Sequence, residues 1–221
     1  MSLENTYESY LKFILEGDKK NSRRVIEEAI KSGVPAIDIY YHVFYPTMVK
    51  TGELWQKNKI SVAREHMITA TTQNIIASLY PLIFKDLAEQ ENSRGKILIA
   101  CPGEELHELG IRMLADIWEL EGWDVTYLGS NIPARFITDS LIEENHDILA
   151  LSNSISFNLK YSKETIEKAK AAGYRGFTVV GGRVFNVDPT LKDYVGADYH
   201  GSDFYQAVQI LEEIEQNKTD H

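Results

Sequence analysis

A carboxylate, an imidazole and a glycine stand close together at Glu105, His107 and Gly110. They follow a short apolar run, residues 96–101, and a Pro-Gly break, which places them in the first loop after a buried strand. A histidine in such a loop, two residues after a carboxylate, is typical of a side chain displayed as a ligand. An ordinary loop with a solvated or packed histidine is the alternative on these residues alone.

A second polar pair, Glu65-His66, lies in an otherwise apolar helical stretch, and Trp55 precedes it at the end of another predicted helix. Adjacent residues on a helix diverge by about 100°, so at least one of the pair should face something polar. The pattern is not that of a zinc-protease helix, which needs a second histidine one turn away. A surface glutamate beside a hydrogen-bonded histidine at the edge of a bundle is the alternative.

Small residues follow the later predicted strands, at Ser152 and Ser154, at Gly181-Gly182 and at Gly129-Ser130. Residues of this size let a bulky ligand approach the backbone closely, although two adjacent glycines also suit a tight turn. The Gly-x-Gly-x-x-Gly pattern is missing from the first loop, which disfavours a dinucleotide cofactor. The acidic residues of a phosphorylated receiver domain are missing from the first and third strand ends.

The elements that must position the Glu105–Gly110 segment alternate between strand and helix over residues 95–221. Five strands with intervening helices predict a flavodoxin-like, Rossmann-type α/β domain with a doubly wound parallel sheet. Ligands of such sheets bind at the carboxyl ends of the strands, near the reversal of strand order. The predicted strands are residues 96–101, 123–128, 147–152, 177–180 and 197–199. The loops expected to form the site are 102–110, 129–133, 152–160 and 181–188, with 199–203 as a further candidate.

Residues 1–89 show helical periodicity and predict a small antiparallel four-helix bundle. Gly33 ends the second helix, Pro35 begins the third, and Ser61 caps a fourth that runs to about Lys85 with a kink at Pro81. The polar segment 89–95 is expected to link the bundle to the α/β domain.

Composition restricts the classes of function. The 221 residues carry a formal net charge of −10, which argues against broad contact with nucleic-acid phosphates. The small basic group from Lys19 to Arg24 is interpreted as the solvated face of a helix. The sequence contains neither a secretory signal nor an apolar run of membrane-spanning length. The single cysteine, Cys101, excludes an intrachain disulfide and fits a reducing cytoplasm, and we interpret it as a small buried residue.

The combination of helical bundle, linker and flavodoxin-like domain resembles the cobalamin-binding proteins over nearly the whole chain. Their signature is Asp-x-His-x-x-Gly, then Ser-x-Leu, then Gly-Gly. This sequence has Glu105-x-His107-x-x-Gly110, Ser152-Asn153-Ser154 and Gly181-Gly182, with Glu in place of Asp and Ser154 in place of Leu. The resemblance implies that His107 is the lower axial ligand of cobalt and that Glu105 accepts its other ring N–H. The cofactor-binding residues that it implies in this domain are Glu105, Leu106, His107, Gly110, Ser152, Ser154, Gly181 and Gly182.

The helical half resembles one branch more closely. Trp55, nine residues, then Glu65-His66 is the pattern of light-sensing regulators that use adenosylcobalamin, in which Glu for Asp also occurs. The resemblance implies that the bundle caps the cofactor, with Trp55 against the upper ligand and Glu65 and His66 hydrogen-bonded to an adenosyl group. Gln56 stands where those regulators have a histidine that captures cobalt after photolysis. His42 and His66 are the candidates for a histidine that takes this role.

The resemblance therefore implies a non-enzymatic cobalamin-binding sensor, with adenosylcobalamin ahead of methylcobalamin as its cofactor. The chain begins directly with the bundle and is acidic, so we expect output through a protein partner or a change of oligomer rather than direct DNA binding. A methyl-corrinoid carrier of a methyltransferase system is the alternative. A flavodoxin-like binding module of another kind, with the motif a coincidence, is the third reading.

Overall fold

The computed structural model describes residues 2–83 and 93–219, which form two compact units, Met1–Ala88 and Glu89–His221. The predicted end of the fourth helix at Lys85 and most of the predicted linker lie outside the described residues. Within those residues, no helix is both long enough and apolar enough to cross a membrane.

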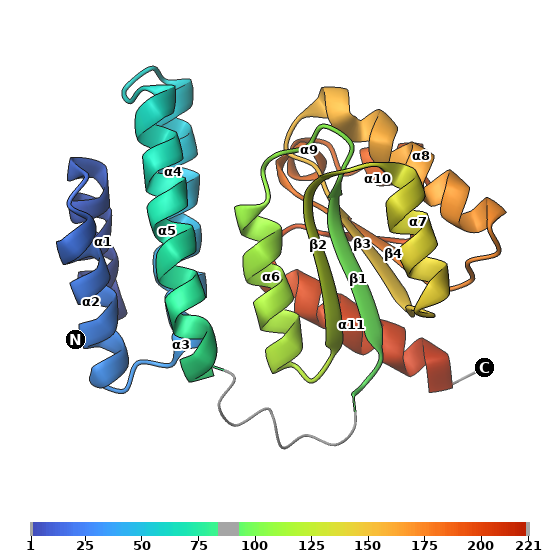
Figure 1. Ribbon diagram of the computed structural model, residues 1–221, viewed down its shortest axis with the longest axis horizontal. Coiled ribbons are helices and arrows are strands. Elements are labelled where there is room, and N and C mark those ends of the chain that lie inside the picture. The colour runs from blue at the N-terminus through green and yellow to red at the C-terminus, as the bar shows by residue number, and fades with distance from the viewer. Residues whose placement is uncertain (1, 84–92, 220–221) are drawn as a thin grey trace. The chain divides into compact units, whose positions relative to one another are not determined.

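The first unit is helical (Figure 1), and α1, α2 and α5 begin at residues whose side chains cap them. Ser2, Asp18 and Ser61 each accept a hydrogen bond from the backbone N–H three residues on, at 3.2, 3.0 and 3.2 Å. The helices are α1 (Leu3–Glu16), α2 (Lys19–Lys31), α3 (Ala36–Ile39), a π-helical segment (Tyr40–Phe44), α4 (Tyr45–Gln56) and α5 (Val62–Ile83).

The sequence predicted one regular third helix, but in the structure this helix is interrupted. A π-helical segment, Tyr40–Phe44, joins α3 to α4, and Pro46 follows it near the start of α4. Proline has no N–H to donate to the carbonyl one turn back, so the helix must change its hydrogen bonding at this point. Pro81, in contrast, lies inside α5, and the helix continues to Ile83.

The core of the helical unit is aliphatic and aromatic. The rings of Tyr10 and Phe44 meet edge to face with centroids 5.4 Å apart, and both side chains are fully buried. The Tyr10 hydroxyl is hydrogen-bonded to Thr72 Oγ1 on α5 at 2.9 Å. This contact fixes α1 against α5.

The second unit is a five-stranded parallel sheet in the order β2-β1-β3-β4-β5, which confirms the predicted doubly wound fold. The strands are β1 (Lys96–Pro102), β2 (Asp124–Ile132), β3 (Ile148–Ser152), β4 (Phe177–Gly181) and β5 (Tyr199–Gly201). The helices are α6 (Leu109–Leu120), α7 (Ala134–Glu143), α8 (Leu159–Ala171), α9 (Arg183–Val187), α10 (Leu191–Val195) and α11 (Phe204–Thr219). Helices α6 and α11 cover one face of the sheet, and α7 and α8 cover the other (Figure 1).

Two strands differ from the prediction. β2 extends to Ile132, so most of the predicted loop 129–133 is strand, and its register against β1 shifts on either side of Ala100. Gly129 and Asn131 adopt left-handed backbone angles, with φ of 86° and 58°, which bend the strand without ending it. The last strand is Tyr199–Gly201, two residues later than predicted. A helix that was not predicted, α10, precedes it and ends at a turn at Gly196, so the strand begins later in the chain.

β1 lies inside the sheet, between β2 and β3, and is buried after its first residue. The strand order reverses between β1 and β3, which are neighbours in the sheet but separated by β2 in the chain. The loops after these two strands therefore flank the switch point, where ligands of doubly wound sheets bind.

Candidate functional site

The Glu105 carboxylate is the centre of a hydrogen-bond network at the switch point. Glu105 lies in the loop after β1 and its side chain is completely buried. Oε1 accepts bonds from the backbone N–H of His107 at 3.1 Å and is 2.5 Å from His107 Nδ1. Oε2 accepts bonds from the backbone N–H groups of Ser154 and Ile155, at 2.9 and 3.2 Å, and from Asn158 Nδ2 at 3.2 Å. One carboxylate thus joins the loops after β1 and β3.

These donors keep Glu105 ionised. Burial alone raises the pKa of a carboxyl group, but hydrogen bonds from His107, Ser154 and Asn158 outweigh it and lower the pKa of Glu105 to about 2. An ionised carboxylate only accepts hydrogen bonds. His107 Nδ1 therefore carries the proton, and in the neutral ring Nε2 holds the lone pair.

His107 is presented rather than packed. Its side chain is 49% exposed although the Glu105 side chain that holds it is completely buried. The backbone carbonyl of His107 lies 3.7 Å from the Cys101 thiol. Cys101 is buried, and burial raises the pKa of its thiol, which fits a small packed residue and disfavours a reactive one. The loop displays one imidazole with its tautomer and orientation fixed.

The loop after β3 contributes polar residues that the sequence analysis did not select. Asn158 is buried, bonds Glu105, and its carbonyl accepts from Asn153 Nδ2 at 3.4 Å. Asn153 Oδ1 in turn accepts a hydrogen bond from Ser162 on α8. No periodicity or spacing marks Asn158, because its partner lies 53 residues away in the chain. Only the pairing of β1 with β3 brings them together.

The predicted small residues divide into two kinds. Ser154 belongs to the network through its backbone N–H, while Ser152 ends β3 and is half-buried. Gly182 adopts φ of 97°, and an added Cβ there would lie 2.4 Å from the Asn153 carbonyl oxygen. The backbone conformation and the lack of space for a Cβ therefore require a glycine at this position. This agrees with a tight turn, the alternative to a ligand-binding role for this residue. Gly181 lies in β4, where an added Cβ would lie 3.2 Å from the Gly201 carbonyl oxygen.

Gly110 is different. It lies in the first turn of α6, is exposed, and an added Cβ would have no atom within 4 Å. The fold therefore has room for a larger residue, so a glycine here fits the close approach of a group outside the chain. Leu106, beside His107, is 67% exposed. Exposed apolar side chains on the neighbouring loops continue this surface: Ile155, Phe157 and Val187.

The helical unit carries a second glutamate–histidine pair. His66 Nδ1 lies 2.6 Å from Glu65 Oε2, and Glu65 Oε1 accepts a bond from Thr69 Oγ1 at 2.9 Å. His66 is exposed, with 75% of its side chain accessible. Trp55, the penultimate residue of α4, is 40% exposed. Because α4 ends at Gln56 and α5 begins at Val62, the structure brings Trp55, Glu65 and His66 to the same end of this unit.

The sequence comparisons identify the family. Residues 95–209 match the model described as the B12 binding domain, and residues 6–80 match a second B12 binding domain model. The first match spans just over half of the chain. The chain belongs to the B12-binding family, and its α/β unit is a cobalamin-binding domain.

Two kinds of curated relative match. Trimethylamine corrinoid protein 2 of Methanosarcina acetivorans is 24% identical over 200 residues, which cover 90% of this chain and 91% of the relative. The HTH-type transcriptional repressor CarH of Myxococcus xanthus is 27% identical over 180 residues, which cover 81% of this chain and 58% of the relative. The match therefore extends over nearly all of the corrinoid protein and over little more than half of the repressor.

The fold has a solved counterpart. The structure of the monomethylamine corrinoid protein of Methanosarcina barkeri has a TM-score of 0.84 and is 17% identical, covering 96% of this chain and all of that one. At this identity the likeness concerns the fold alone.

The residues present fit a corrinoid. The corrin ring supplies the equatorial ligands of its cobalt, so the protein needs to offer one further donor, and neutral imidazole is a good one. His107 offers Nε2 with the proton held on Nδ1 by Glu105. The exposed Gly110 and Leu106 leave an open, apolar surface beside it.

Proposed function

We propose that this chain is a cobalamin-binding sensor that holds cobalt through His107 Nε2 as the lower axial ligand. Glu105 positions the ring and increases its donor strength, since it accepts the Nδ1 proton. Leu106 and Gly110 face the corrin, and Ser152, Ser154, Gly181 and Gly182 line the slot for the nucleotide tail. The chain binds and reports on the cofactor; it is not an enzyme.

The helical unit supplies the contacts to the upper ligand, which we take to be adenosyl. Trp55 packs against this ligand, and Glu65 and His66 form hydrogen bonds to it. The observation that carries the sensor function is the hydrogen-bonded pair of exposed His66 and partly buried Glu65, at the same end of the unit as the partly exposed Trp55. The core of a bundle does not require an exposed histidine and an exposed tryptophan at this end. Adenosylcobalamin supplies a cobalt–carbon bond that light can break, which gives the bundle two states to distinguish.

Gln56 stands in place of the histidine that captures cobalt in the light-sensing regulators, and the positions of His42 and His66 support the second of these as its replacement. His42 lies thirteen residues before Trp55 along the α3–α4 path, which at 1.5 Å per residue is about 20 Å away. His66 lies at the Trp55 end with Nδ1 held by Glu65. We assign any second imidazole ligand to His66.

Output proceeds through a protein partner or a change of oligomer in the cytoplasm. The net charge of −10 disfavours direct nucleic-acid binding. The match to the CarH repressor covers 58% of that protein, and the B12-binding models match residues 6–80 and 95–209 of this chain. The single cysteine fits a reducing compartment.

Loading the purified protein with adenosylcobalamin in the dark tests this function. We expect a red protein that keeps its colour through desalting, and illumination that changes its mass in solution. Trp55→Ala should abolish the light response and leave the dark complex coloured. Loss of all corrin on desalting contradicts the proposal, as does an identical mass before and after light.

A methyl-corrinoid carrier is the second candidate, favoured by the match to nearly the whole length of trimethylamine corrinoid protein 2. A carrier exchanges a methyl group with methyltransferases, so it should prefer methylcobalamin and keep its assembly under light. Competition between methyl- and adenosylcobalamin for the dark protein separates the two. Tenfold tighter binding of methylcobalamin, without a light response, would replace the sensor by the carrier.

A further inference from the structure

The helical unit contains a cationic pocket that the proposed function does not use. It has a volume of about 150 Å³ and lies between α2 and α5. Lys19 and Arg23 from α2 and Asn74 from α5 form its polar lining, and Met67 and Ile75 contribute apolar surface. The α5 residues of this lining differ from Glu65 and His66, the pair assigned to the cofactor.

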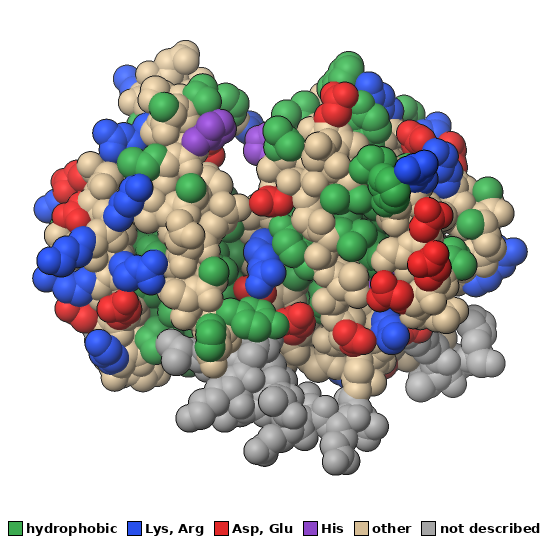
Figure 2. Space-filling view, viewed as in Figure 1, with side chains coloured by type: hydrophobic (Ala, Val, Ile, Leu, Met, Phe, Trp, Pro, Cys, Tyr) green, Lys and Arg blue, Asp and Glu red, His purple; other side chains and the backbone are tan. Residues whose placement is uncertain are grey.

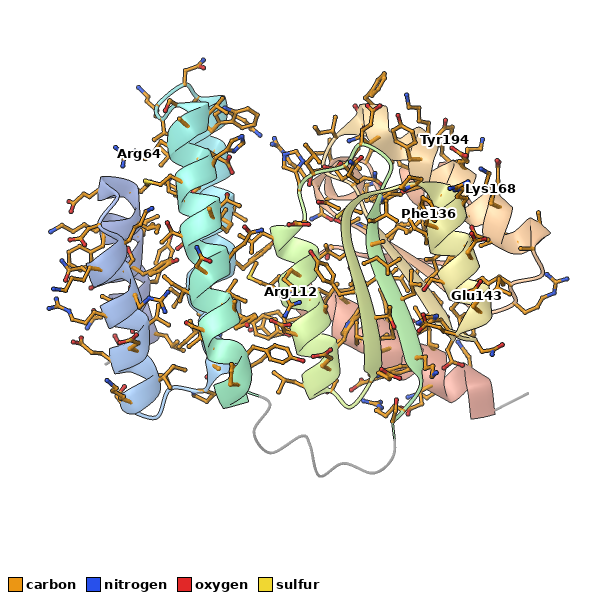
Figure 3. All side chains as sticks on the ribbon, viewed as in Figure 1. Arg64, Arg112, Phe136, Glu143, Lys168 and Tyr194 are labelled. Carbon is orange, nitrogen blue, oxygen red and sulfur yellow. The ribbon has the colours of Figure 1, made fainter. Side chains whose placement is uncertain are left out.

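The positive charge of the pocket comes from α2. Lys19 and Arg23 are one turn apart on this helix, so both lie on the same face. Arg64 on α5 is not part of the lining, and its Nη1 lies against Gly17, 2.5 Å from where an added Cβ would stand. Figure 2 shows Lys and Arg side chains gathered over this side of the helical unit, and Figure 3 shows Arg64 extending from α5 toward the α1–α2 turn.

Within residues 2–83 and 93–219, none of these three cations has a carboxylate partner. Arg23 donates one hydrogen bond, to Ser78 Oγ at 3.0 Å. The neighbouring Arg24, in contrast, forms an ion pair with Glu28 at 3.7 Å. The acidic neighbour in sequence, Asp18, is bonded to Asn21 at the start of α2. Among the residues that the structure describes, the two cations that line the pocket are thus without a carboxylate partner, in a chain with 33 acidic and 23 basic residues.

We propose that this pocket binds a phosphate group, as inorganic phosphate or as a small phosphate monoester. Lys19 and Arg23 supply the charge, and the Asn74 amide supplies a neutral donor. Compact anions with several acceptor oxygens suit such convergent donors better than a single carboxylate does. The anion bridges α2 and α5, so its binding stabilises the helical unit.

Calorimetric titration and thermal unfolding of the full chain test this site, with inorganic phosphate compared with chloride at equal ionic strength. We expect saturable binding and a Tm that rises with phosphate and not with chloride. Arg23→Gln and Lys19→Gln should each weaken binding tenfold or more, while the matched control Arg24→Gln changes it less than twofold. Circular dichroism verifies that each variant is folded.

Glycerol phosphate, titrated in parallel, distinguishes a phosphate monoester from inorganic phosphate as the preferred ligand. The preferred ligand is the one that binds more tightly, and tighter binding of either one supports the site. Equal affinities in the Arg23→Gln and Arg24→Gln variants would overturn the proposal. So would an effect of phosphate no larger than that of chloride in the unaltered protein.

Discussion

The two units each carry a histidine whose Nδ1 is held by a glutamate, and the two pairs differ in their surroundings. The separations are alike, 2.5 Å for His107 and Glu105 and 2.6 Å for His66 and Glu65. The Glu105 side chain is completely buried, whereas that of Glu65 is 22% exposed. Glu105 has donors from two loops besides its histidine, and Glu65 has Thr69 one turn along its own helix.

This difference indicates different tasks for the same chemical pair. A buried carboxylate with all its oxygens satisfied fixes the imidazole in one tautomer and one orientation, as a permanent metal ligand requires. A pair on the surface of a helix changes rotamer at little cost and suits a contact that is made and lost. We therefore expect changes at Glu105 to affect the whole unit and changes at Glu65 to act locally.

Glu105→Gln should have the largest effect on stability. Glutamine keeps the size of the side chain but replaces one acceptor oxygen by an NH₂ group, which then faces backbone N–H donors in either orientation of the amide. The lowered pKa, from 4.5 to about 2, corresponds to about 3 kcal/mol of unfolding free energy. Urea unfolding of the cofactor-free protein at neutral pH should show a loss of that order. A loss below about 0.5 kcal/mol would mean that Glu105 does not hold the loops together.

The same pair predicts a pH dependence. The folded pKa of Glu105 is about 2, below its ordinary value of 4.5. The folded state therefore binds the proton more weakly, and the stabilisation is present above about pH 4.5 and is lost as the pH falls toward 2. Acid unfolding of the unaltered protein should steepen in this window relative to Glu105→Gln. Parallel curves for the two proteins would contradict the assignment.

Asn158→Ala should cost less, about 1 kcal/mol, because it removes one of several donors to Glu105. The same urea experiment measures it. Asn158→Asp sharpens the test, since it places a second carboxylate against Glu105 and should destabilise the protein more than alanine does. If the two variants are equally stable, the Asn158 amide does not donate to Glu105.

Glu65→Gln should have the smallest effect on stability, about 0.5 kcal/mol or less, because the pair is exposed. If the proposed sensor function holds, its consequence should instead be seen in the light response of the loaded protein, since His66 loses the carboxylate that holds its Nδ1. Thermal unfolding and mass in solution before and after light provide the two readings. A loss of stability as large as that of Glu105→Gln would remove the contrast between the pairs.

Sequence patterns predicted the elements and the position of His107 in the loop after β1, because these depend on local periodicity and on one short motif. They did not predict Asn153, Asn158 and Ser162, whose bonds form only when the loops after β1 and β3 meet. The extension of β2 was missed because Gly129 and Asn131 are typical of loops and are tolerated here as bends. The sequence left Gly182 open to two roles, room for a ligand or a tight turn, and the structure shows that a Cβ there would lie 2.4 Å from the Asn153 carbonyl oxygen.

Coordination of cobalt by His107 is the central claim, and electron paramagnetic resonance tests it most directly. The protein is loaded with cobalamin, reduced to the cobalt(II) form, and prepared with ordinary or isotopically labelled histidine. Labelling should change the nitrogen splitting of the cobalt signal, and His107→Ala should remove that change while His66→Ala retains it. An unchanged splitting in the labelled, unaltered protein would show that His107 is not the lower ligand.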